Sequence, residues 1–498
     1  MSSRMPTLLR RLLADVGDAR TSGDPDVIIS SITVDSRTVE PGALFVCLRG
    51  AHADGHDFAA QAVQRGAVAI LAERDVELPK RTSLAIVRDT LEALSPVSAA
   101  YYGHPSDELT CVGVTGTNGK TTTAHFIEAI ATAAGRPFGM IGTLGARLGT
   151  SFAADLEHTT PYAHDVQQLL ARFRTAGAAG AILETSSHAL ALHRVDDVDF
   201  DVAVLTNVTH DHLDFHGSFE AYRQAKRTLF ERTARGSGRK AGGACVLNLD
   251  DAEGRHLAAT LPRSMSYALE NPHAHFQATG VRYGVDATTF SVAALRPAPF
   301  TIHLPGPYNL ANALAAIAAA CALDLEPEAI AEGVASVKGV PGRMTAVPAG
   351  DVGVYVDFAH TPDGLRNVLE AARAIATRRV LCVFGCGGDR DALKRPVMGR
   401  IARELADVVY LTSDNPRYED PQRIIDDILA GLTGALGGDY VVLVDRIEAI
   451  ERAIGDARPG DVVIIAGKGH EPYQLIRDQK LPFSDVAVAE AAIRRVRA

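Results

Sequence analysis

The sequence predicts an α/β protein of three domains. Its 498 residues are enough for about three domains of roughly 150 residues each. Short apolar runs rich in β-branched residues alternate with helical segments along most of the chain, which is typical of sheets covered by helices. Stretches that contain proline and glycine interrupt this alternation at residues 101–106 and 338–343. We therefore predict a small N-terminal α/β domain (residues 1–106), a central parallel-sheet domain (107–341) and a C-terminal Rossmann-like domain (342–498).

The predicted strands are apolar runs bounded by turn residues. In the N-terminal domain they are residues 27–34, 43–48 and 67–72, with a helical stretch after His56. In the central domain they are residues 109–114, 180–184, 201–206 and 244–249, and an alanine-rich helix follows Pro307. In the C-terminal domain they are residues 352–357, 379–384, 407–412, 440–444 and 461–466. The regular alternation in the last two domains predicts parallel sheets covered on both faces.

The composition is ordinary for a globular protein, with 47% hydrophobic residues, 22% charged residues and a net charge of -10. Such a balance gives no overall basic surface for nucleic acid or for an anionic membrane, so any phosphate binding must be local. The sequence has no run of about 18 apolar residues, and residues 1–15 lack the apolar segment and cleavage site of a signal peptide. We expect a cytoplasmic protein without membrane insertion and without a nucleic-acid partner.

The six cysteines are spread over the chain, and most of them lie in apolar stretches. This distribution predicts reduced, buried thiols and not a disulfide framework. Cys382 and Cys386 form the only close pair in the sequence, and no second pair completes a zinc site.

The strongest local signal is a glycine-rich loop at residues 113–122, between a predicted strand and a predicted helix. In such a loop, glycines let backbone N–H groups turn toward phosphate oxygens, and the helix N-terminus adds its positive dipole end. Lys120 would reach the β- and γ-phosphates, and Thr121 would bind magnesium. The spacing matches the strict pattern only in part, because five residues separate Gly113 from Gly119. The alternative is a glycine turn with a surface lysine, but the flanking elements favour a central P-loop domain.

Polar side chains also follow the next strands of the central domain. Glu184 ends the predicted strand 180–184, at the edge where open α/β sheets bind their ligands, and it is placed to bind a hard cation. A solvated acid at a strand end is the alternative. The next strand leads into residues 206–217, where three histidines and two aspartates fall within seven residues. Zinc is one interpretation of that stretch, but hard oxygen ligands near a nucleotide favour magnesium.

Four predicted strands of the C-terminal domain end in charged loops, at residues 357–362, 385–391, 412–417 and 466–471. Because the carboxyl ends of parallel strands meet at one edge of the sheet, these loops predict a binding crevice along that edge. Each loop taken alone is equally consistent with a surface turn.

Taken together, these motifs resemble the Mur ligases, a family of ATP-dependent amide-forming enzymes of peptidoglycan precursor synthesis. The resemblance is carried by residues 115–122, Glu184 and residues 207–217, 306–312, 341–343 and 357–362, and it covers essentially the whole chain. Within the family, four stretches look like the members that add meso-2,6-diaminopimelate to UDP-N-acetylmuramoyl-L-alanyl-D-glutamate. These stretches are residues 34–37, 159–161, 186–188 and 414–417. The resemblance implies that the N-terminal domain binds the UDP-sugar, the central domain binds ATP and Mg²⁺, and the C-terminal domain binds diaminopimelate.

The resemblance also implies roles for individual residues. It implies catalytic roles for Lys120, Glu184, His212 and Lys226. It implies ATP binding by Thr115, Gly116, Thr117, Asn118, Gly119, Lys120, Thr121, Thr122, Asn309, Arg343 and Asp357. It implies that the UDP-sugar-dipeptide contacts Ser36, Thr159, Thr160, Ser186 and Arg194. It implies that diaminopimelate contacts Arg390, Asp414, Asn415, Pro416, Arg417, Gly467 and Glu471. The implied metal ligands are Thr121, Glu184, His212 and Lys226, the last as a carbamate.

The implied cofactor is Mg²⁺, with ATP as co-substrate. A carbamate would turn the cationic side chain of Lys226 into an oxygen ligand, whereas the plain alternative is a solvated helix lysine. The other implied partners are the two small-molecule substrates, and we expect a monomer. The implied biological role is cell wall biogenesis, and through it cell shape, cell division and the cell cycle.

The choice of diaminopimelate depends mainly on Arg390 and Arg417. Diaminopimelate ends in an ammonium and a carboxylate, and an arginine binds a carboxylate through two parallel hydrogen bonds. Lysine as substrate offers only the ammonium, so Arg417 would also select against it. Three positions depart from the family pattern: Thr345 replaces an acid, Phe358 replaces a tyrosine and Leu192 replaces a polar residue.

Three alternative functions stay open at this point. Two are related enzymes, a ligase that adds L-lysine and a folylpolyglutamate synthetase that shares the phosphate loop. The third is a nucleotide-driven switch or transport ATPase, which predicts ATP turnover without an acceptor amine. For the ligase, residues 338–343 predict a hinge about which the last two domains close.

Overall fold

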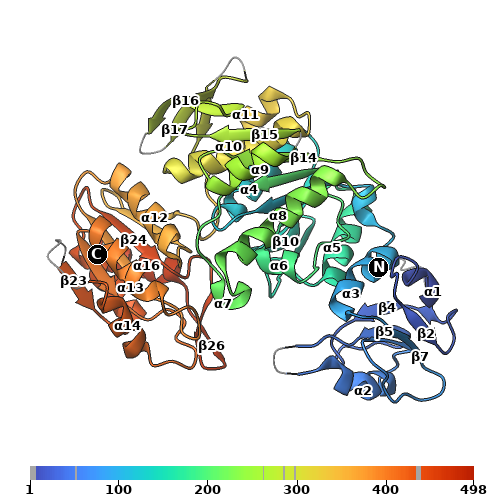
Figure 1. Cartoon of the computed structure of the whole chain (residues 1–498). Coiled ribbons are helices and arrows are strands. Elements are labelled where there is room, and N and C mark those ends of the chain that lie inside the picture. The colour runs from blue at the N-terminus through green and yellow to red at the C-terminus, as the bar shows by residue number, and fades with distance from the viewer. Residues whose placement is uncertain are drawn as a thin grey trace.

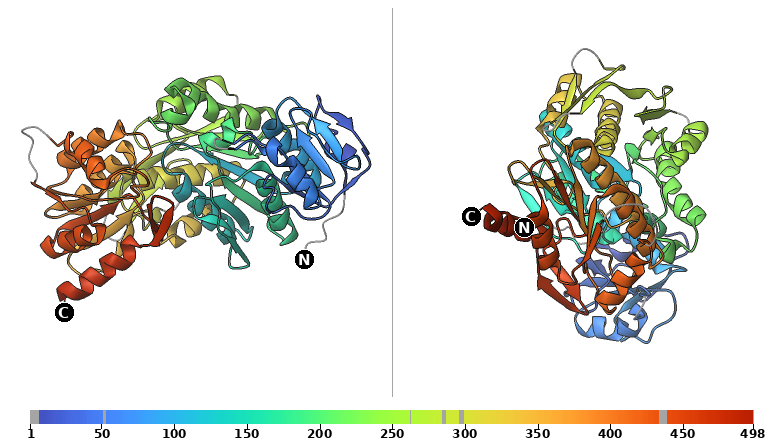
Figure 2. Two further views of the ribbon diagram at one scale, coloured as in Figure 1. Left: turned by 90° about the horizontal axis from the view of Figure 1, so that it is seen from below. Right: turned by 90° about the vertical axis from the view of Figure 1, so that its left-hand side faces the viewer.

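The computed structural model of the chain describes residues 7–50, 53–261, 263–283, 287–295, 299–432 and 439–497. Its three large sheets follow one another along the chain, within residues 20–86, 110–302 and 345–466. The three α/β bodies stand in a row when seen from below, with the N-terminal part at one end and the C-terminal part at the other (Figure 2). The predicted three-part α/β fold is confirmed, while the boundaries after residues 106 and 341 stay predictions.

The N-terminal sheet has five strands in the order β2-β7-β6-β5-β4, with only β2 antiparallel to its neighbour. These strands are β2 (Arg20–Ser22), β4 (Ser31–Thr33), β5 (Ala43–Val46), β6 (Ala69–Ala72) and β7 (Ser83–Ile86). Its helices are α1 (Leu9–Leu12), α2 (Ala59–Gln64) and α3 (Thr90–Tyr102), with 3-10 turns at Gly55–Phe58 and Pro105–Asp107. The predicted strand 27–34 is divided in two, because β3 (Ile28–Ile29) pairs with β1 (Thr7–Leu8) outside this sheet.

The middle sheet has eleven strands in the order β11-β10-β9-β12-β8-β13-β14-β15-β16-β17-β18. The strands from β9 to β16 in this order are parallel, and antiparallel strands extend the sheet at both ends. Its strands are β8 (Thr110–Thr115), β9 (Phe138–Gly142), β10 (Gly145–Leu148), β11 (Phe152–Ala154), β12 (Gly180–Glu184), β13 (Val202–Leu205), β14 (Ala244–Asn248), β15 (Ser264–Ala268), β16 (Phe276–Tyr283), β17 (Thr288–Val292) and β18 (Phe300–Ile302). The four strands predicted from the sequence correspond to β8, β12, β13 and β14.

Helices cover both faces of the middle sheet (Figure 1). Alternate residues of β8 enter opposite cores: Val112 and Val114 pack on the helices of one face, and Cys111 packs on the helices of the other. The helices of this domain are α4 (Lys120–Ala133), α5 (Ala163–Thr175), α6 (Ser187–Ala191), α7 (Leu213–His216), α8 (Phe219–Arg235), α9 (Ala252–Thr260), α10 (Pro307–Ala322) and α11 (Pro327–Ser336). The helix predicted after Pro307 is α10, and burial on both faces explains why the central strands read as continuous apolar runs.

The C-terminal sheet has six strands in the order β19-β20-β24-β21-β22-β23, and all but β19 are parallel. Its strands are β19 (Thr345–Val347), β20 (Gly353–Asp357), β21 (Val380–Phe384), β22 (Val408–Leu411), β23 (Asp439–Val442) and β24 (Val462–Ala466). One face packs on α12 (Pro362–Ile375), α13 (Lys394–Leu405) and α14 (Pro421–Leu429), and the other on α15 (Arg446–Asp456) and α16 (Asp485–Arg497). A separate hairpin joins β25 (Tyr473–Ile476) to β26 (Gln479–Pro482). All five strands predicted for this domain are present.

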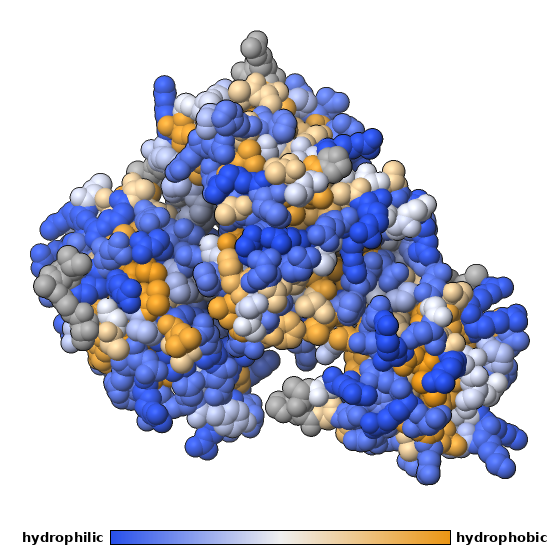
Figure 3. Space-filling model, viewed as in Figure 1, coloured by the Kyte–Doolittle hydropathy of each residue, from blue (hydrophilic) through white to orange (hydrophobic). Residues whose placement is uncertain are grey.

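The space-filling view shows an open space below the middle domain, between the N-terminal and C-terminal domains (Figure 3). Polar contacts join the N-terminal domain to the middle domain. For example, Arg239 forms an ion pair with Asp15 at 3.1 Å, and the N–H of Asp197 donates to Oγ of Ser95 at 3.1 Å.

In the part of the chain that the structure describes, no helix is both long and apolar enough to cross a membrane.

Candidate active site

The phosphate loop joins the end of β8 to the start of α4. Gly116 and Gly119 have φ angles of 149° and 89°, which other residues rarely adopt. A Cβ on Gly116 would lie 1.9 Å from Oγ1 of Thr206, and one on Gly119 would lie 2.3 Å from Oδ1 of Asn312. Both positions therefore require glycine, and α4 begins directly after them at Lys120. The loop thus places its backbone at the positive end of a helix, as phosphate binding requires.

Side chains from two neighbouring elements hold this loop in place. The N–H of Asn118 donates to Oδ1 of Asn207 at 2.9 Å, and Oγ1 of Thr206 donates to the Asn118 carbonyl at 2.6 Å. Oγ1 of Thr117 lies 2.8 Å from the hydroxyl of Tyr222 on α8. The loop conformation therefore depends on the end of β13 and on one face of α8.

Two lysines converge on the loop carbonyls. Nζ of Lys120 donates to the carbonyls of Gly116 at 2.9 Å and Thr117 at 3.0 Å, and Nζ of Lys226 donates to the same Gly116 carbonyl at 2.9 Å. Burial lowers the pKa of both lysines, and the charge of Lys120 lowers the pKa of Lys226 further. Because Lys226 is only 2% exposed, its interpretation as a solvated helix lysine is wrong.

Glu184 lies fully buried at the end of β12 and faces the first turn of α4. Its Oε2 accepts from Oγ1 of Thr121 at 2.9 Å and from Oγ1 of Thr143 at 3.1 Å, and its Oε1 accepts from the Thr143 N–H at 3.0 Å. Its alternative interpretation as a solvated acid is therefore wrong. Within the described ranges, no three His, Cys, Asp or Glu side chains gather into a metal-binding group. The adjacent oxygens of Thr121 and Glu184 fit a Mg²⁺ ion that takes its remaining ligands from phosphate and water.

His212 and His216, from the stretch after β13, lie against His188 of α6 and next to Lys226. The ring centroids of His188 and His212 are 4.7 Å apart, and those of His188 and His216 are 5.7 Å apart. Burial lowers the pKa of His212, and burial together with the neighbouring histidines lowers the pKa of His188 to about 4. The charge of Lys226 also contributes to the lowered pKa of His212, so these two predicted metal ligands are neighbours. A neutral imidazole at pH 7 has a lone pair with which it can bind a cation.

Four of the residues predicted to bind the UDP-sugar-dipeptide lie beside Glu184. Oγ1 of Thr160 donates to the Glu184 carbonyl at 2.7 Å, and Nη1 of Arg194 donates to the Thr160 carbonyl at 2.8 Å. Oγ1 of Thr159 lies 3.2 Å from Oγ1 of Thr143, and Oγ of Ser186 accepts the N–H of Ala189 at 3.1 Å to cap α6.

Ser36, the fifth predicted residue, lies in the N-terminal domain, where its Oγ donates to Oε1 of Gln61 at 3.0 Å. The carboxylate of Asp35 and, more weakly, that of Glu157 raise the pKa of the neighbouring Arg37. Glu157 belongs to the middle domain, so charges of both domains act on this arginine.

Arg343, at the end of the predicted hinge segment 338–343, contacts the phosphate loop. Its Nη2 donates to Oγ1 of Thr121 at 3.2 Å, and its guanidinium lies 5.1 Å from the ring centroid of Phe358. The carboxylate of Asp357 accepts the N–H groups of Met344 at 2.7 Å and Ala359 at 2.8 Å, and burial raises its pKa. Asp357 therefore shapes the backbone around Arg343 with both of its oxygens.

Asn309 and Thr345 complete the surroundings of the hinge. Nδ2 of Asn309 donates to the Pro305 carbonyl at 2.7 Å at the start of α10, close behind the phosphate loop. Oγ1 of Thr345 accepts the Gly342 N–H at 2.9 Å. The threonine found where the family has an acid thus closes the turn of the hinge. Leu192 ends α6, and the structure gives no reason for an apolar residue there.

The predicted diaminopimelate residues meet at the carboxyl edge of the C-terminal sheet, and we call this set the donor site. A Cβ on Gly467, which has a φ of 119°, would lie 2.4 Å from Oδ2 of Asp414. Nη1 of Arg417 donates to the Gly388 carbonyl at 2.7 Å, and the charge of Arg390 contributes to a lowered pKa of Arg417, after burial. The donor site comprises Arg390, Asp414, Asn415, Pro416, Arg417, Gly467 and Glu471. It therefore combines cationic and anionic side chains, as a substrate with both ammonium and carboxylate groups requires.

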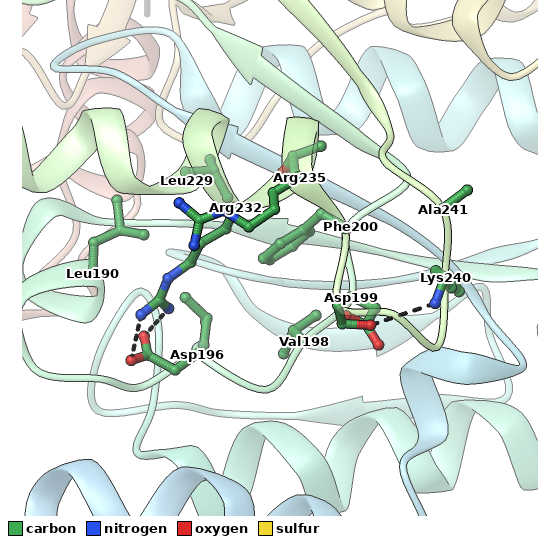
Figure 4. A pocket seen from close by; sticks show the side chains of 14 residues that line it. Leu190, Asp196, Val198, Asp199, Phe200, Leu229, Arg232, Arg235, Lys240 and Ala241 are labelled. Atoms are coloured by element: carbon green, nitrogen blue, oxygen red, sulfur yellow. Dashed lines mark hydrogen bonds and ion pairs between the residues drawn. The ribbon is translucent and has the colours of Figure 1, made fainter.

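A cavity of about 200 Å³ lies elsewhere in the middle domain, between the end of α8 and residues 195–200 (Figure 4). Arg232 and Asp196 form an ion pair at its wall. None of the residues predicted for substrates or metal lines this cavity, so it is separate from the phosphate loop.

Three stretches of the chain match known protein families. Residues 28–102 match the family described as Mur ligase family, catalytic domain. Residues 114–320 match the Mur ligase middle domain, and residues 342–469 match the Mur ligase, glutamate ligase domain. The chain belongs to the Mur ligase family. The resemblance inferred from the motifs is thereby confirmed, and each match falls within one of the three predicted domains.

Individual Mur ligases are similar to this chain over its whole length. The UDP-N-acetylmuramoyl-L-alanyl-D-glutamate–2,6-diaminopimelate ligase of Syntrophomonas wolfei is 44% identical over 99% of both chains. A solved structure of a ligase with the same name superposes with a TM-score of 0.69 at 31% identity, covering 99% of this chain and 100% of the other. The MurF ligase of Thermotoga maritima in complex with ADP shares the fold, with a TM-score of 0.63 at 20% identity over 94% and 96% of the two chains.

Several residues at this Mur ligase site were not predicted from the sequence. Thr143 fixes Glu184, Tyr222 supports the phosphate loop, and Lys468 bonds two residues of the donor site. Tyr222 lies one helical turn before Lys226, so helical periodicity is a signal that could have found it. Thr143 follows a strand that the apolar pattern did not reveal, and no sequence signal pointed to it.

Proposed function

We propose that this Mur ligase uses ATP to add meso-2,6-diaminopimelate to UDP-N-acetylmuramoyl-L-alanyl-D-glutamate. The observation that carries the proposal is the donor site, where the charges of Arg390, Asp414 and Glu471 all act on Arg417. A carboxylate and an ammonium on the same carbon of the substrate match this pair of opposite charges. The full-length relatives named as diaminopimelate ligases support the same choice.

The proposed reaction has two steps. The side-chain carboxylate of the D-glutamate attacks the γ-phosphorus of ATP and forms an acyl phosphate and ADP. The amine of diaminopimelate then attacks the acyl carbon, and the tetrahedral intermediate collapses to an amide and phosphate, with the amine proton released to solvent or phosphate. In both steps the chain positions reactants and neutralises charge: Lys120 and Arg343 face the phosphates, and Thr159, Thr160 and Arg194 hold the acceptor.

Mg²⁺ would supply Lewis-acid charge neutralisation of the phosphates at Thr121 and Glu184. The lowered pKa of Lys226 keeps a fraction of its amine neutral, and only a neutral amine adds to CO₂ to form a carbamate. We propose that Lys226 is carbamylated and that, with His212, it completes the metal site. Nuclear magnetic resonance in ¹³C-bicarbonate should then show a carbamate carbonyl signal that is absent from Lys226→Met, and the proposal fails if the wild-type protein lacks that signal.

Mass spectrometry of the product tests the proposed function. The protein is incubated with ATP, Mg²⁺, the UDP-N-acetylmuramoyl dipeptide and either meso-diaminopimelate or L-lysine. We expect a tripeptide precursor with diaminopimelate and very little with lysine. An unchanged dipeptide precursor under all conditions would refute the proposal, and a lysine product would identify the lysine-adding alternative.

Two further assays separate the remaining alternatives. A folylpolyglutamate synthetase would release ADP in the presence of a folate and glutamate. A nucleotide-driven switch or transport ATPase would release phosphate without any acceptor or amine. We expect phosphate release only when both the dipeptide precursor and diaminopimelate are present.

We also propose that the enzyme works as a cytoplasmic monomer and that its last two domains close about residues 338–343. The bond from Arg343 to Thr121 supports a hinge of this kind, because it links the hinge to the phosphate loop across domains. Small-angle scattering with and without ATP and the dipeptide precursor should show compaction on binding. Light scattering should give the mass of one chain.

A further inference from the structure

Lys468 is a fully buried cation behind the donor site, and nothing in the proposed reaction uses it. It lies in the loop after β24, between Gly467 and Glu471. Its Nζ donates to Oδ1 of Asn415 at 2.9 Å and to Oε2 of Glu471 at 2.9 Å. The ring centroid of Tyr473 on β25 lies 5.7 Å from Nζ. A buried ammonium is costly unless it is paired and hydrogen-bonded, and here both conditions are met by residues of the donor site.

These bonds determine the orientation of the Asn415 amide. Oδ1 accepts from Nζ of Lys468 and also from the N–H of Leu475 at 2.8 Å. A flipped amide would place its NH₂ group against these two donors, so only one orientation satisfies both. In that orientation Nδ2 donates to Oε2 of Glu471 at 2.9 Å. Lys468 and the backbone N–H of Leu475 therefore together set the orientation of the Asn415 amide, and Lys468 is the only side chain of the two.

The same network leaves one oxygen of Glu471 for a ligand. Oε2 accepts from both Asn415 and Lys468. From the residues that the structure describes, no hydrogen bond reaches Oε1, and the Glu471 side chain is 21% exposed. A substrate ammonium would therefore find a single carboxylate oxygen at a fixed place.

We propose that Lys468 is a positioning residue that selects the stereoisomer of the diamino acid by fixing the Asn415 amide and the free oxygen of Glu471. This inference rests on the proposed function. At the far stereocentre of diaminopimelate, the L,L isomer exchanges the places of two groups relative to the meso isomer. Glu471 would accept a hydrogen bond from the substrate ammonium, and Arg417 would donate to the substrate carboxylate. If both side chains are held rigidly, they distinguish the two arrangements, whereas a mobile Glu471 does not.

The test compares Lys468→Met with the matched control Lys480→Met. Lys480 is exposed, and its Nζ lies 4.9 Å from the centroid of the same Tyr473 ring, but it bonds neither Asn415 nor Glu471. In Lys468→Met we expect the KM for meso-diaminopimelate to rise at least about tenfold, as expected for lost hydrogen bonds to a charged group. We expect kcat to change less, and the KM values for ATP and the dipeptide precursor to stay the same. The preference in kcat/KM for meso over L,L-diaminopimelate should also fall, whereas Lys480→Met should behave as wild type.

The outcomes separate this inference from the proposed function. If wild-type protein forms no diaminopimelate product, the proposed function is wrong and the inference is wrong with it. If wild type forms product and Lys468→Met keeps both the KM and the isomer preference, only the inference is overturned. Should Lys468→Met fail to fold, Lys468→Gln keeps an uncharged NH₂ donor on a side chain one atom shorter and should show a smaller change of the same sign. An unchanged isomer preference in a folded Lys468→Gln protein would also overturn the inference.

Discussion

The phosphate loop and the donor site are built in different ways. The phosphate loop is one continuous segment whose backbone faces the ligand, and two glycines allow its shape. The donor site combines side chains from three separate loops, and buried bonds such as that from Lys468 to Asn415 align them. A backbone site is specific for phosphate but tolerant of side-chain changes around it, whereas a side-chain site can distinguish similar amino acids and depends on every supporting contact.

The largest effect is expected where the phosphate loop uses a side chain. Lys120→Ala should lower kcat at least about 1,000-fold, because a charge that neutralises the transferring phosphoryl group is lost. Product formation at saturating substrates measures this effect, and the exposed Lys80→Ala serves as the control with unchanged kcat. A Lys120→Ala enzyme with nearly normal kcat would show that the loop does not bind the reacting phosphates.

A smaller effect is expected for a charge-conserving change in the donor site. Arg417→Lys should lower kcat/KM for diaminopimelate by about 100-fold, because a lysine cannot form two parallel bonds with a carboxylate. The KM for ATP should not change, and the exposed Arg400→Lys on α13 should behave as wild type. If Arg417→Lys binds diaminopimelate normally, a different residue reads the carboxylate.

A moderate effect is expected for Thr143, whose bonds hold Glu184 beside the phosphate loop. Thr143→Val removes the hydroxyl bond of 3.1 Å to Oε2 but keeps the backbone bond to Oε1. We expect about tenfold more Mg²⁺ to be needed for half-maximal rate, consistent with the loss of one bond to a charged group. Thr143→Ser should restore the wild-type requirement. An unaltered Mg²⁺ dependence in Thr143→Val would separate Glu184 from metal binding.

The smallest effect concerns stability behind the phosphate loop. Burial lowers the pKa of His125 on α4 to about 4, below its ordinary value of 6.5. Between these values the unfolded chain binds more protons than the folded one, so stability falls as the pH drops from 6.5 toward 4. The share of His125 should be roughly 1–2 kcal/mol at pH 5. Urea midpoints at pH 7.5 and 5 should differ less in His125→Gln than in wild type, and equal differences would contradict the assignment.

In the middle sheet the sequence predicted four neighbouring strands, β12, β8, β13 and β14, and missed the strands on either side of them, including the buried β9. The strands β8, β12 and β13 are buried on both faces, so their residues form continuous apolar runs. The strand β10 contains an arginine, and the edge strand β11 beyond it is partly exposed, so their pattern is weaker. The antiparallel extension of β16 to β18 was missed for the same reason, since β16 is polar over much of its length.

The residues of the candidate site also differ in how far the sequence alone could place them. The phosphate loop, Glu184 and the histidine stretch each follow a strand in the sequence and could be placed on one sheet edge by topology alone. The roles of the donor-site residues came from resemblance, since a charged loop by itself is also consistent with a surface turn. The bonds of Thr143 to Glu184 and of Lys468 to Asn415 join residues more than 40 positions apart, so no local pattern could reveal them.

By itself, the sequence determined the conformation of the phosphate loop, because glycines at fixed positions between a strand and a helix specify a backbone conformation locally. It also determined the fold class, since strand and helix periodicities are local properties. Only the tertiary structure decided how the donor site is oriented. Side chains that are distant in the sequence determine the orientation of the Asn415 amide, the unpaired oxygen of Glu471 and the burial of Lys226.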